Sequence, residues 1–377
     1  MRRSVVLLLL AACPGVVDDI GTPPMDDGGT AGGTTGGGSS GGGESNAGGD
    51  ANAGGGATAT AGGGAVTAGG GATAGGGATA GGANTAGGGQ GTAGGAPSCA
   101  NISGDRRTQV CLRWNCDRQD MSEGTWNGQV NPVCNPGDLT AAARANALKL
   151  INLYRFIADL PAVTTSQPRN QWAQQCALMM DANNDLDHNP PTSWSCYSAD
   201  GGYAAGKSNI CSGRAVRCVD LYMSDFGAGN APVLGHRRWF LSNQLGPVGI
   251  GGTTGGSCHW VINGSGNAGK PWVAWPPPGP VPLQAIAIPG LQSIDQVGWH
   301  VQGHTVNVYD AGITVTDNGV NLPVTVSNLG ANYGSPSAIK FIPNGWVSQA
   351  GHTYQVTLSG GSLAAPINYA VQVEACP

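Results

Sequence analysis

The chain has 377 residues, of which 66 are glycine and only 10% are charged, and its formal net charge is −5. This low, slightly acidic charge argues against a nucleic-acid partner, because binding to phosphates requires clustered lysine and arginine side chains. Half of the glycines lie in the first quarter of the chain, so a packed core is expected only in the later part, roughly 280 residues long and large enough for one large or two modest cores.

Residues 1–12 are typical of an export signal, with two arginines followed by the short apolar run Val5–Leu10. The run is too short to span a bilayer. Residues 10–13, Leu-Ala-Ala-Cys, resemble the bacterial lipobox, in which the cysteine becomes the lipid-modified first residue of the mature protein. The alternative is a plain secretory signal. Removing Cys13 from the 11 cysteines leaves an even number, which suits full pairing in an oxidising compartment. We therefore predict a cell-envelope, extracytoplasmic protein held at the membrane by lipid on Cys13.

Residues 13–97 consist mainly of Gly, Ala, Thr and Ser, with Thr-Ala-Gly-Gly-Gly recurring irregularly. The segment has almost nothing to bury and lacks the strict period of collagen, so it is predicted to be a disordered tether. Residues 98–138 are a cysteine-rich lead-in without a sustained hydrophobic period. Zinc binding and disulfide pairing are both conceivable there, and an oxidising compartment favours disulfides.

Helical periodicity follows, and then short β-type runs. The first predicted helix begins near Leu139, after the candidate cap Asp138, and ends before Pro161. Two more helices are predicted at 170–184 and 213–226, followed by strands at 248–251, 259–262 and 272–275. Helices followed by strands in one unit indicate an α+β layered domain, predicted to cover residues 139–275.

The proline-rich segment after Trp275 is predicted to be an extended domain boundary. Beyond it, period-two runs separated by Gly, Asn and Pro indicate a small all-β, sandwich-like domain over residues 276–377. The predicted strands are 305–308, 313–315, 324–326, 339–341, 354–358 and 369–373. His300, His304 and His352 lie in or beside these runs and are predicted to face solvent.

Five short motifs between residues 139 and 275 resemble, in order, the signature of the CAP superfamily of cysteine-rich secretory, antigen 5 and pathogenesis-related 1 proteins. They are Asn-Leu-Tyr-Arg at 152–155, Asp-His at 187–188, Ser-Asn-Ile at 208–210, Gly-His-Arg at 235–237 and Val-Gly-Ile-Gly at 248–251. The resemblance implies an αβα sandwich and a secreted protein. A CAP domain with a β-rich tail is also similar to an arrangement seen in bacterial exported proteins.

The resemblance further implies a cleft lined by two histidines and two acidic residues, which bind a divalent metal in some members. By matching motifs, the histidines are His188 and His236. Ser208, beside Asn209, stands where many members have the first carboxylate, and Asp225 takes the place of the second. The tetrad is incomplete, so the predicted cofactor is at most a weakly bound divalent metal such as zinc.

Two functions follow from these candidate residues. The favoured one is a non-enzymatic module that binds a lipid, glycan or protein partner. The alternative is a metal-dependent, peptidase-like hydrolase that uses His188, His236 and Asp225. Local roles are also open: His188 as a hydrogen-bonding partner of the preceding helix end, His236 as a packing residue, and Asp225 as a solvated or capping carboxylate. The sequence contains neither Gly-x-Ser-x-Gly nor His-Glu-x-x-His, which favours the binding module.

Overall fold

The computed structural model describes residue 99 and residues 102–376. The predicted signal peptide, the lipid site at Cys13 and the tether at 13–97 lie outside the described residues. Within the described residues, no helix combines the length and apolar character needed to cross a membrane.

Helices come mainly before residue 241 and strands mainly after residue 248. The helices are α1 (Arg106–Asp117), α2 (Ala141–Ile157), α3 (Gln167–Asn183), α4 (Ala199–Ala205), α5 (Ala215–Ser224), α6 (Gly235–Phe240), α7 (Leu283–Ile286) and α8 (Ile294–Val297). The strands up to Trp275 are β1 (Ser208–Cys211), β2 (Gly249–Gly252), β3 (Ser257–Trp260) and β4 (Trp272–Trp275). The later strands are β5 (Gly279–Pro282), β6 (Trp299–Gly303), β7 (Gly312–Asp317), β8 (Val320–Leu322), β9 (Val324–Asn328), β10 (Ser337–Pro343), β11 (Thr353–Ser359) and β12 (Ile367–Glu374).

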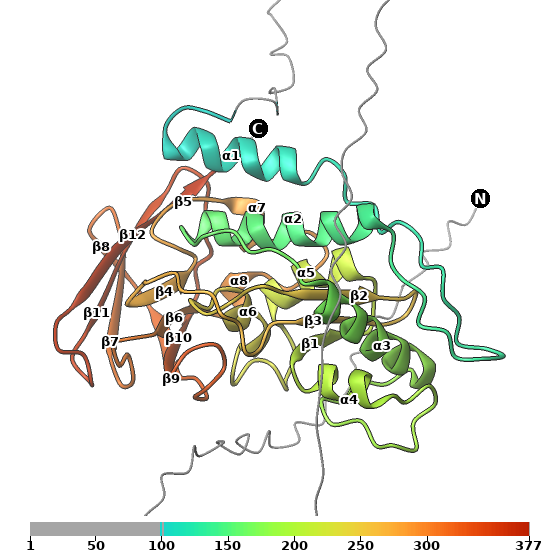
Figure 1. Cartoon of the computed structure of the whole chain (residues 1–377). Coiled ribbons are helices and arrows are strands. Elements are labelled where there is room, and N and C mark those ends of the chain that lie inside the picture. Colours follow the sequence, from blue (N-terminus) through green and yellow to red (C-terminus); the bar gives the residue numbers. More distant parts are fainter. Residues whose placement is uncertain (1–98, 100–101, 377) are drawn as a thin grey trace, which may run out of the picture. The chain divides into compact units, whose positions relative to one another are not determined.

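A three-stranded antiparallel sheet in the order β1-β3-β2 forms the middle layer of the first part. Helices α2 and α5 lie on one side of this sheet, and α3 and α4 lie on the other (Figure 1). The predicted αβα sandwich is therefore confirmed. Every residue of the three strands is buried, as expected for a sheet covered on both faces.

The glycines of β2 allow helix α3 to pack directly against the strand backbone. A Cβ atom at Gly251 would lie 2.2 Å from backbone atoms of α3, so no larger residue fits there. Side-chain amides of α3 then satisfy the edge of the strand: Asn170 Oδ1 accepts from the Ile250 N–H at 2.8 Å, and Gln174 exchanges two hydrogen bonds with Gly252. The Val-Gly-Ile-Gly motif is thus a packing requirement.

The three predicted helices correspond to α2, α3 and α5, with ends shifted by a few residues. The predicted cap of the first was wrong: Thr140, not Asp138, accepts a hydrogen bond from the Ala143 N–H at 3.3 Å. The carboxylate of Asp138 instead pairs with Arg144. Helix α1 was not predicted from the lead-in. It buries Val110 and Trp114 against α2 and β5.

Two sheets make up the β-rich part, with strand orders β4-β6-β10-β9 and β5-β12-β11-β7-β8. They pack face to face, with the rings of Trp299 on β6 and Tyr354 on β11 in edge contact at 5.8 Å. The predicted sandwich-like unit is therefore confirmed as β-rich, but it is not all-β, because α7 and α8 lie within it. The strand at 272–275, predicted as part of the CAP domain, pairs with β6 and belongs to this unit. The predicted strand at 305–308 was wrong, because residues 304–306 form a bend and 307–308 have no regular structure, and β5, β6 and β8 were missed.

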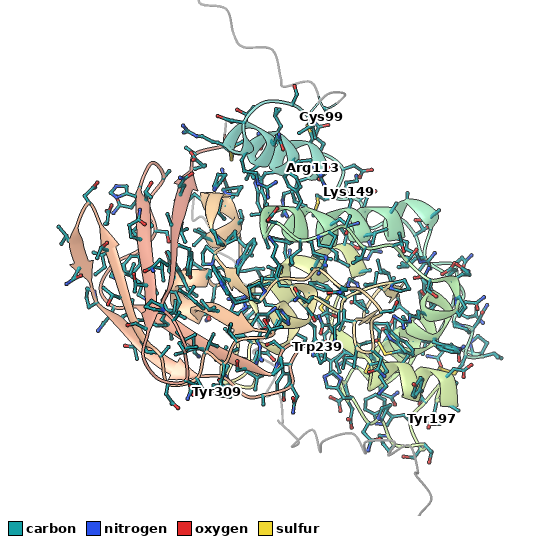
Figure 2. The ribbon with its side chains drawn as sticks, turned by 60° about the vertical axis from the view of Figure 1, so that its left-hand side comes forward. Cys99, Arg113, Lys149, Tyr197, Trp239 and Tyr309 are labelled. Carbon is teal, nitrogen blue, oxygen red and sulfur yellow. A yellow bond between two sulfur atoms is a disulfide. The ribbon has the colours of Figure 1, made fainter. Side chains whose placement is uncertain are left out.

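One hydrophobic cluster runs through both parts of the described chain. Tyr154 of α2 packs edge-on against Trp275 of β4, and the same cluster continues to Trp299. Side chains fill the space between the helical and β-rich parts (Figure 2). The prediction that His300 faces solvent was wrong, because its side chain is fully buried in β6 between the two parts. His304 and His352 are half-buried.

Ten of the cysteines form five disulfides within the described residues, as predicted. The pairs are Cys99–Cys116, Cys111–Cys376, Cys134–Cys196, Cys176–Cys258 and Cys211–Cys218. The alternative of a zinc site in residues 98–138 was wrong, because all four cysteines of this segment are in disulfides. The pair Cys111–Cys376 spans 265 residues of sequence and fixes α1 beside the end of β12.

Candidate functional site

The centre of the candidate site is a hydrogen-bonded pair, Asp225 and His236. Asp225 follows the last residue of α5 in a left-handed conformation, with φ 55°, which Asp and Asn tolerate better than most residues. Its side chain is 0% exposed. One carboxylate oxygen accepts from His236 Nδ1 at 2.8 Å, and the other accepts from the Arg237 backbone N–H at 3.1 Å. Asp225 is therefore a capping carboxylate for the first turn of α6 and is not solvated.

The bond to Asp225 determines which nitrogen of His236 is available. A carboxylate only accepts hydrogen bonds, so Nδ1 carries a proton and Nε2 is the nitrogen left for other partners. The side chain of His236 is 20% exposed. Tyr222 lies beneath the imidazole, with 5.0 Å between ring centroids. The backbone carbonyl of His236 accepts from Asn209 Nδ2 at 3.1 Å, which ties α6 to β1.

His188 lies beyond the end of α3 and is fixed by a different helix. Its Nδ1 lies 3.0 Å from the carbonyl oxygen of Ala205, the last residue of α4. The alternative that His188 bonds the end of the preceding helix was therefore wrong. Burial lowers the pKa of His188, the bond to Ala205 opposes this effect, and the charge of His236 lowers the pKa further. The two histidines are thus close enough to interact electrostatically.

Ser208 occupies a closed position. It is 2% exposed on β1, opposite Trp260 of β3, and its hydroxyl is buried. Ser208 therefore has a short, enclosed hydroxyl where the family resemblance implies a carboxylate, and a hydroxyl cannot supply negative charge to a metal ion. In the described part of the chain, no three His, Cys, Asp or Glu side chains form a group that could hold a metal. The donor set, two imidazoles and one carboxylate already bound twice, does not fit a divalent-metal site.

Behind Tyr222 the wall of the site is buried and contains a further histidine. The ring of His259 lies 5.4 Å from that of Tyr222 and 6.0 Å from that of Phe240. Burial lowers the pKa of His259 to about 3 and raises the pKa of Tyr222. His259 is therefore neutral at physiological pH and supports the site by packing.

Arg237 and Arg238 are buried structural residues next to the site, and their role was not predicted from the sequence. Arg237 is 0% exposed and donates to the carbonyls of Met223, Ser224 and Gly298 at 2.7, 2.7 and 2.8 Å. It therefore joins α5, through α6, to the start of β6. The signal available in the sequence was two adjacent arginines in a chain with few charges.

Arg238 makes a second link to the β-rich part. Its guanidinium donates to the Val233 and Gly330 carbonyls and to Ser335. Burial lowers the pKa of Arg238 to about 10, and it does the same for Arg237. The Gly-His-Arg motif thus presents one histidine to the cleft and uses the arginines that follow it to join the two parts of the fold.

An αβα sandwich in which α3 packs on a glycine-rich strand, with a histidine from beyond α3 near a second histidine from α6, defines a domain of the CAP type. Residues 148–263 match the family model described as the cysteine-rich secretory protein family, CAP. This part of the chain is a CAP domain, as the five motifs predicted. No curated protein and no solved structure matches the chain.

Proposed function

We propose that this chain is a cell-envelope lipoprotein whose CAP domain binds a lipid, glycan or protein partner without catalysing a reaction on it. One observation carries the proposal. Asp225, the carboxylate beside His236, is fully buried and accepts hydrogen bonds from His236 and from the Arg237 N–H. It holds α6 in place and has no oxygen left without a partner, so the cleft is built as a rigid recognition surface.

The disulfides and the CAP domain together indicate an extracytoplasmic protein, because disulfides persist in oxidising compartments. Lipid on Cys13 is the proposed anchor. One acyl chain binds a membrane only marginally, and the bacterial lipoprotein modification adds more than one chain, which makes the anchorage stable.

A metal-dependent, peptidase-like hydrolase is the second candidate, and one feature favours it. Asp225 orients His236 so that Nε2 is free to accept a proton at a partly exposed position, as a general base requires. The missing first carboxylate and the buried Ser208 in its place weigh against this candidate.

Hydrolysis separates the two functions. The full-length chain is incubated with a mixed peptide library, with and without added zinc, beside the variants His236→Ala and His352→Ala. His352 is the matched control, since it also pairs with an aspartate, Asp317 at 2.6 Å, but lies in the β-rich part. We expect no cleavage above background from any of the three. Zinc-stimulated cleavage that His236→Ala abolishes and His352→Ala retains would overturn the proposal.

A further inference from the structure

A cavity lies away from His188 and His236, on the α3 and α4 side of the CAP domain. It is an open groove of about 480 Å³, a size within the range of small-molecule sites, about 300–1,000 Å³. Helix α3 forms its floor, and two loops form its walls. Trp194 and Tyr197 are its aromatic residues, and Gln175, Thr192 and Ser198 are polar residues that line it. Tyr197 is labelled beside α4 in Figure 2, far from Tyr309 of the β-rich part.

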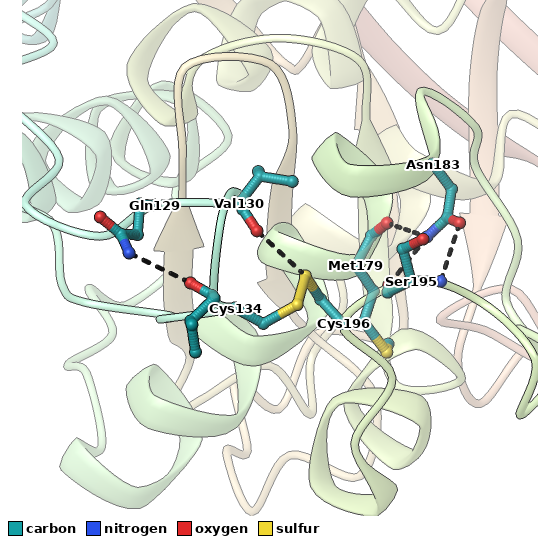
Figure 3. Close-up of a disulfide and its surroundings, with 8 residues drawn as sticks. Gln129, Val130, Cys134, Met179, Asn183, Ser195 and Cys196 are labelled. Carbon is teal, nitrogen blue, oxygen red and sulfur yellow. Dashed lines mark hydrogen bonds between the residues drawn. A yellow bond between two sulfur atoms is a disulfide. The ribbon is translucent and has the colours of Figure 1, made fainter.

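The wall that carries Trp194 and Tyr197 is fixed to helix α3. Asn183 donates to the Ser195 carbonyl at 3.0 Å and accepts from the Ser195 N–H at 3.1 Å (Figure 3). Three residues further on, the Ser198 hydroxyl donates to Gln175 Oε1 at 2.6 Å. The loop is therefore held at Ser195, next to Trp194, and at Ser198, next to Tyr197, so binding a ligand costs little free energy for ordering the loop.

The opposite wall is a small hairpin held across the groove by a disulfide. Gln129 and Asn135 exchange two backbone hydrogen bonds of 2.9 Å. Between them lies Cys134, which is bonded to Cys196 of the aromatic loop (Figure 3). The disulfide therefore fixes the separation of the two walls.

The chemistry of the lining selects a class of ligand. None of the described residues that line the groove is charged. The lining carries polar groups that can bond a ligand: the Trp194 indole N–H, the Tyr197 and Thr192 hydroxyls and the Gln175 amide. A phosphate, carboxylate or polyanionic ligand is matched by arginine or lysine, which the lining lacks. A lipid tail would leave these polar groups unpaired.

A peptide bound as an added strand is also a poor match, because that mode needs an open sheet edge and the groove is walled by a helix and loops. A neutral sugar matches both features of the lining. Its C–H faces pack on aromatic rings, whose faces carry partial negative charge, and its hydroxyls exchange hydrogen bonds with amides and hydroxyls.

We infer that this groove is a binding site for a neutral oligosaccharide. The inference goes beyond the proposed function, because it assigns a ligand class to a site that shares no residue with the His188 and His236 cleft. It adds to the proposed role of the chain as a binding module. Trp194 and Tyr197 provide the stacking surfaces, and Gln175 and Thr192 provide hydrogen bonds to the sugar hydroxyls.

Calorimetric titration of the full-length chain tests the inference with three defined probes: β-1,4-linked N-acetylglucosamine trimer, cellotriose and the acidic trimer trigalacturonate. At least one neutral trimer is expected to bind at millimolar or lower concentration and more tightly than the acidic trimer. Trp194→Ala is expected to weaken that binding at least tenfold, and Trp194→Phe, which keeps a ring, by less. Tyr203→Ala, at an exposed ring of α4 that does not line the groove, is the control and should leave affinity unchanged.

Trp194 also packs against a buried apolar cluster, so its truncation can disturb folding. Thr192→Val removes only an exposed hydroxyl and is the second variant, with a three- to tenfold loss expected. Absence of binding by both neutral trimers, tighter binding of the acidic trimer, or affinity that survives both Trp194→Ala and Thr192→Val would overturn the inference. If the sugars do not bind and the chain also shows no zinc-dependent hydrolysis, only this inference fails and the proposed function stands. Hydrolysis that requires His236 contradicts the proposed function and leaves this inference untouched.

Discussion

Replacing Asp225 by Asn is expected to destabilise the CAP domain and to change the tautomer of His236. The carboxylate accepts two hydrogen bonds with its side chain 0% exposed, from His236 Nδ1 at 2.8 Å and from the Arg237 N–H at 3.1 Å. Asparagine has nearly the same shape and tolerates the left-handed conformation, with φ 55°. The substitution therefore isolates the loss of charge and of one acceptor.

The magnitude follows from these two bonds. A hydrogen bond to a charged group contributes about 1.5–3 kcal/mol, and asparagine can keep only one of the two. Its amide N–H₂ then faces a second donor, which adds an unpaired polar group at about 1–3 kcal/mol unless the partner rearranges. His236 can rearrange by moving its proton from Nδ1 to Nε2. We therefore expect a loss of about 2–4 kcal/mol in the free energy of unfolding, together with an Nε2–H tautomer.

Guanidinium unfolding followed by tryptophan fluorescence measures the loss, and nitrogen-15 NMR of the histidine rings identifies the tautomer. Asp185→Asn, at an exposed carboxylate close to His188 in sequence, is the control and should change stability by no more than about 0.5 kcal/mol. A loss in the free energy of unfolding no greater than that of the control, or a His236 that keeps its proton on Nδ1, would contradict this prediction.

Three further predictions concern other parts of the chain. Burial lowers the pKa of His259 to about 3 from 6.5. The free energy of unfolding is therefore independent of this group above pH 6.5, and it falls below that pH, by about 2 kcal/mol at pH 5, because the unfolded chain binds a proton there and the folded chain does not. His259→Gln should flatten the pH dependence of unfolding, and an unchanged slope would contradict this. Arg237→Lys should lower stability by about 2–3 kcal/mol, because an ammonium group cannot replace the fork that reaches three carbonyls; a thermal melt unchanged by the substitution would refute it. Cys13→Ser should release the chain from the membrane fraction, and a variant that still sediments with membranes would exclude the lipid anchor.

The fold of the CAP domain could be predicted largely because its helices carry clear stripes. Leu150, Ile151 and Tyr154 recur at helical spacing and are fully buried in α2. Helix α1 has a less obvious pattern, since only Val110 and Trp114 are buried and it depends on disulfides and on contacts with distant β5. Such nonlocal support leaves little signal in a short stretch of sequence.

Strand β6 shows the same limit more sharply. Its sequence, Trp-His-Val-Gln-Gly, alternates polar and apolar residues, which indicates a strand with one solvated face. The strand is buried on both faces, however, because the polar side chains meet the buried arginines after His236. Gln302 donates to the carbonyls of Arg238 and Leu241. Burial lowers the pKa of His300, and the charges of both arginines lower it further.

In the candidate site, motif order led to His188, Asn209, Asp225 and His236, but not to their bonding. Asp225 accepts a hydrogen bond from the Arg237 N–H because of the way α5 and α6 meet. The local spacing of residues in the sequence does not predict that arrangement. The groove was also beyond sequence reasoning. Its walls face each other only because Cys134 pairs with Cys196 across 62 residues, and pairing among ten cysteines cannot be deduced from spacing.

If the surface around His188 and His236 binds a partner without a metal, and Asp225 stabilises the fold, the chain should hold no stoichiometric zinc. The full-length chain is produced in zinc-supplemented medium, purified without chelator and measured by elemental analysis beside His236→Ala. We expect far less than one zinc per chain in both proteins, with no difference between them. One zinc per wild-type chain that disappears in His236→Ala would contradict it.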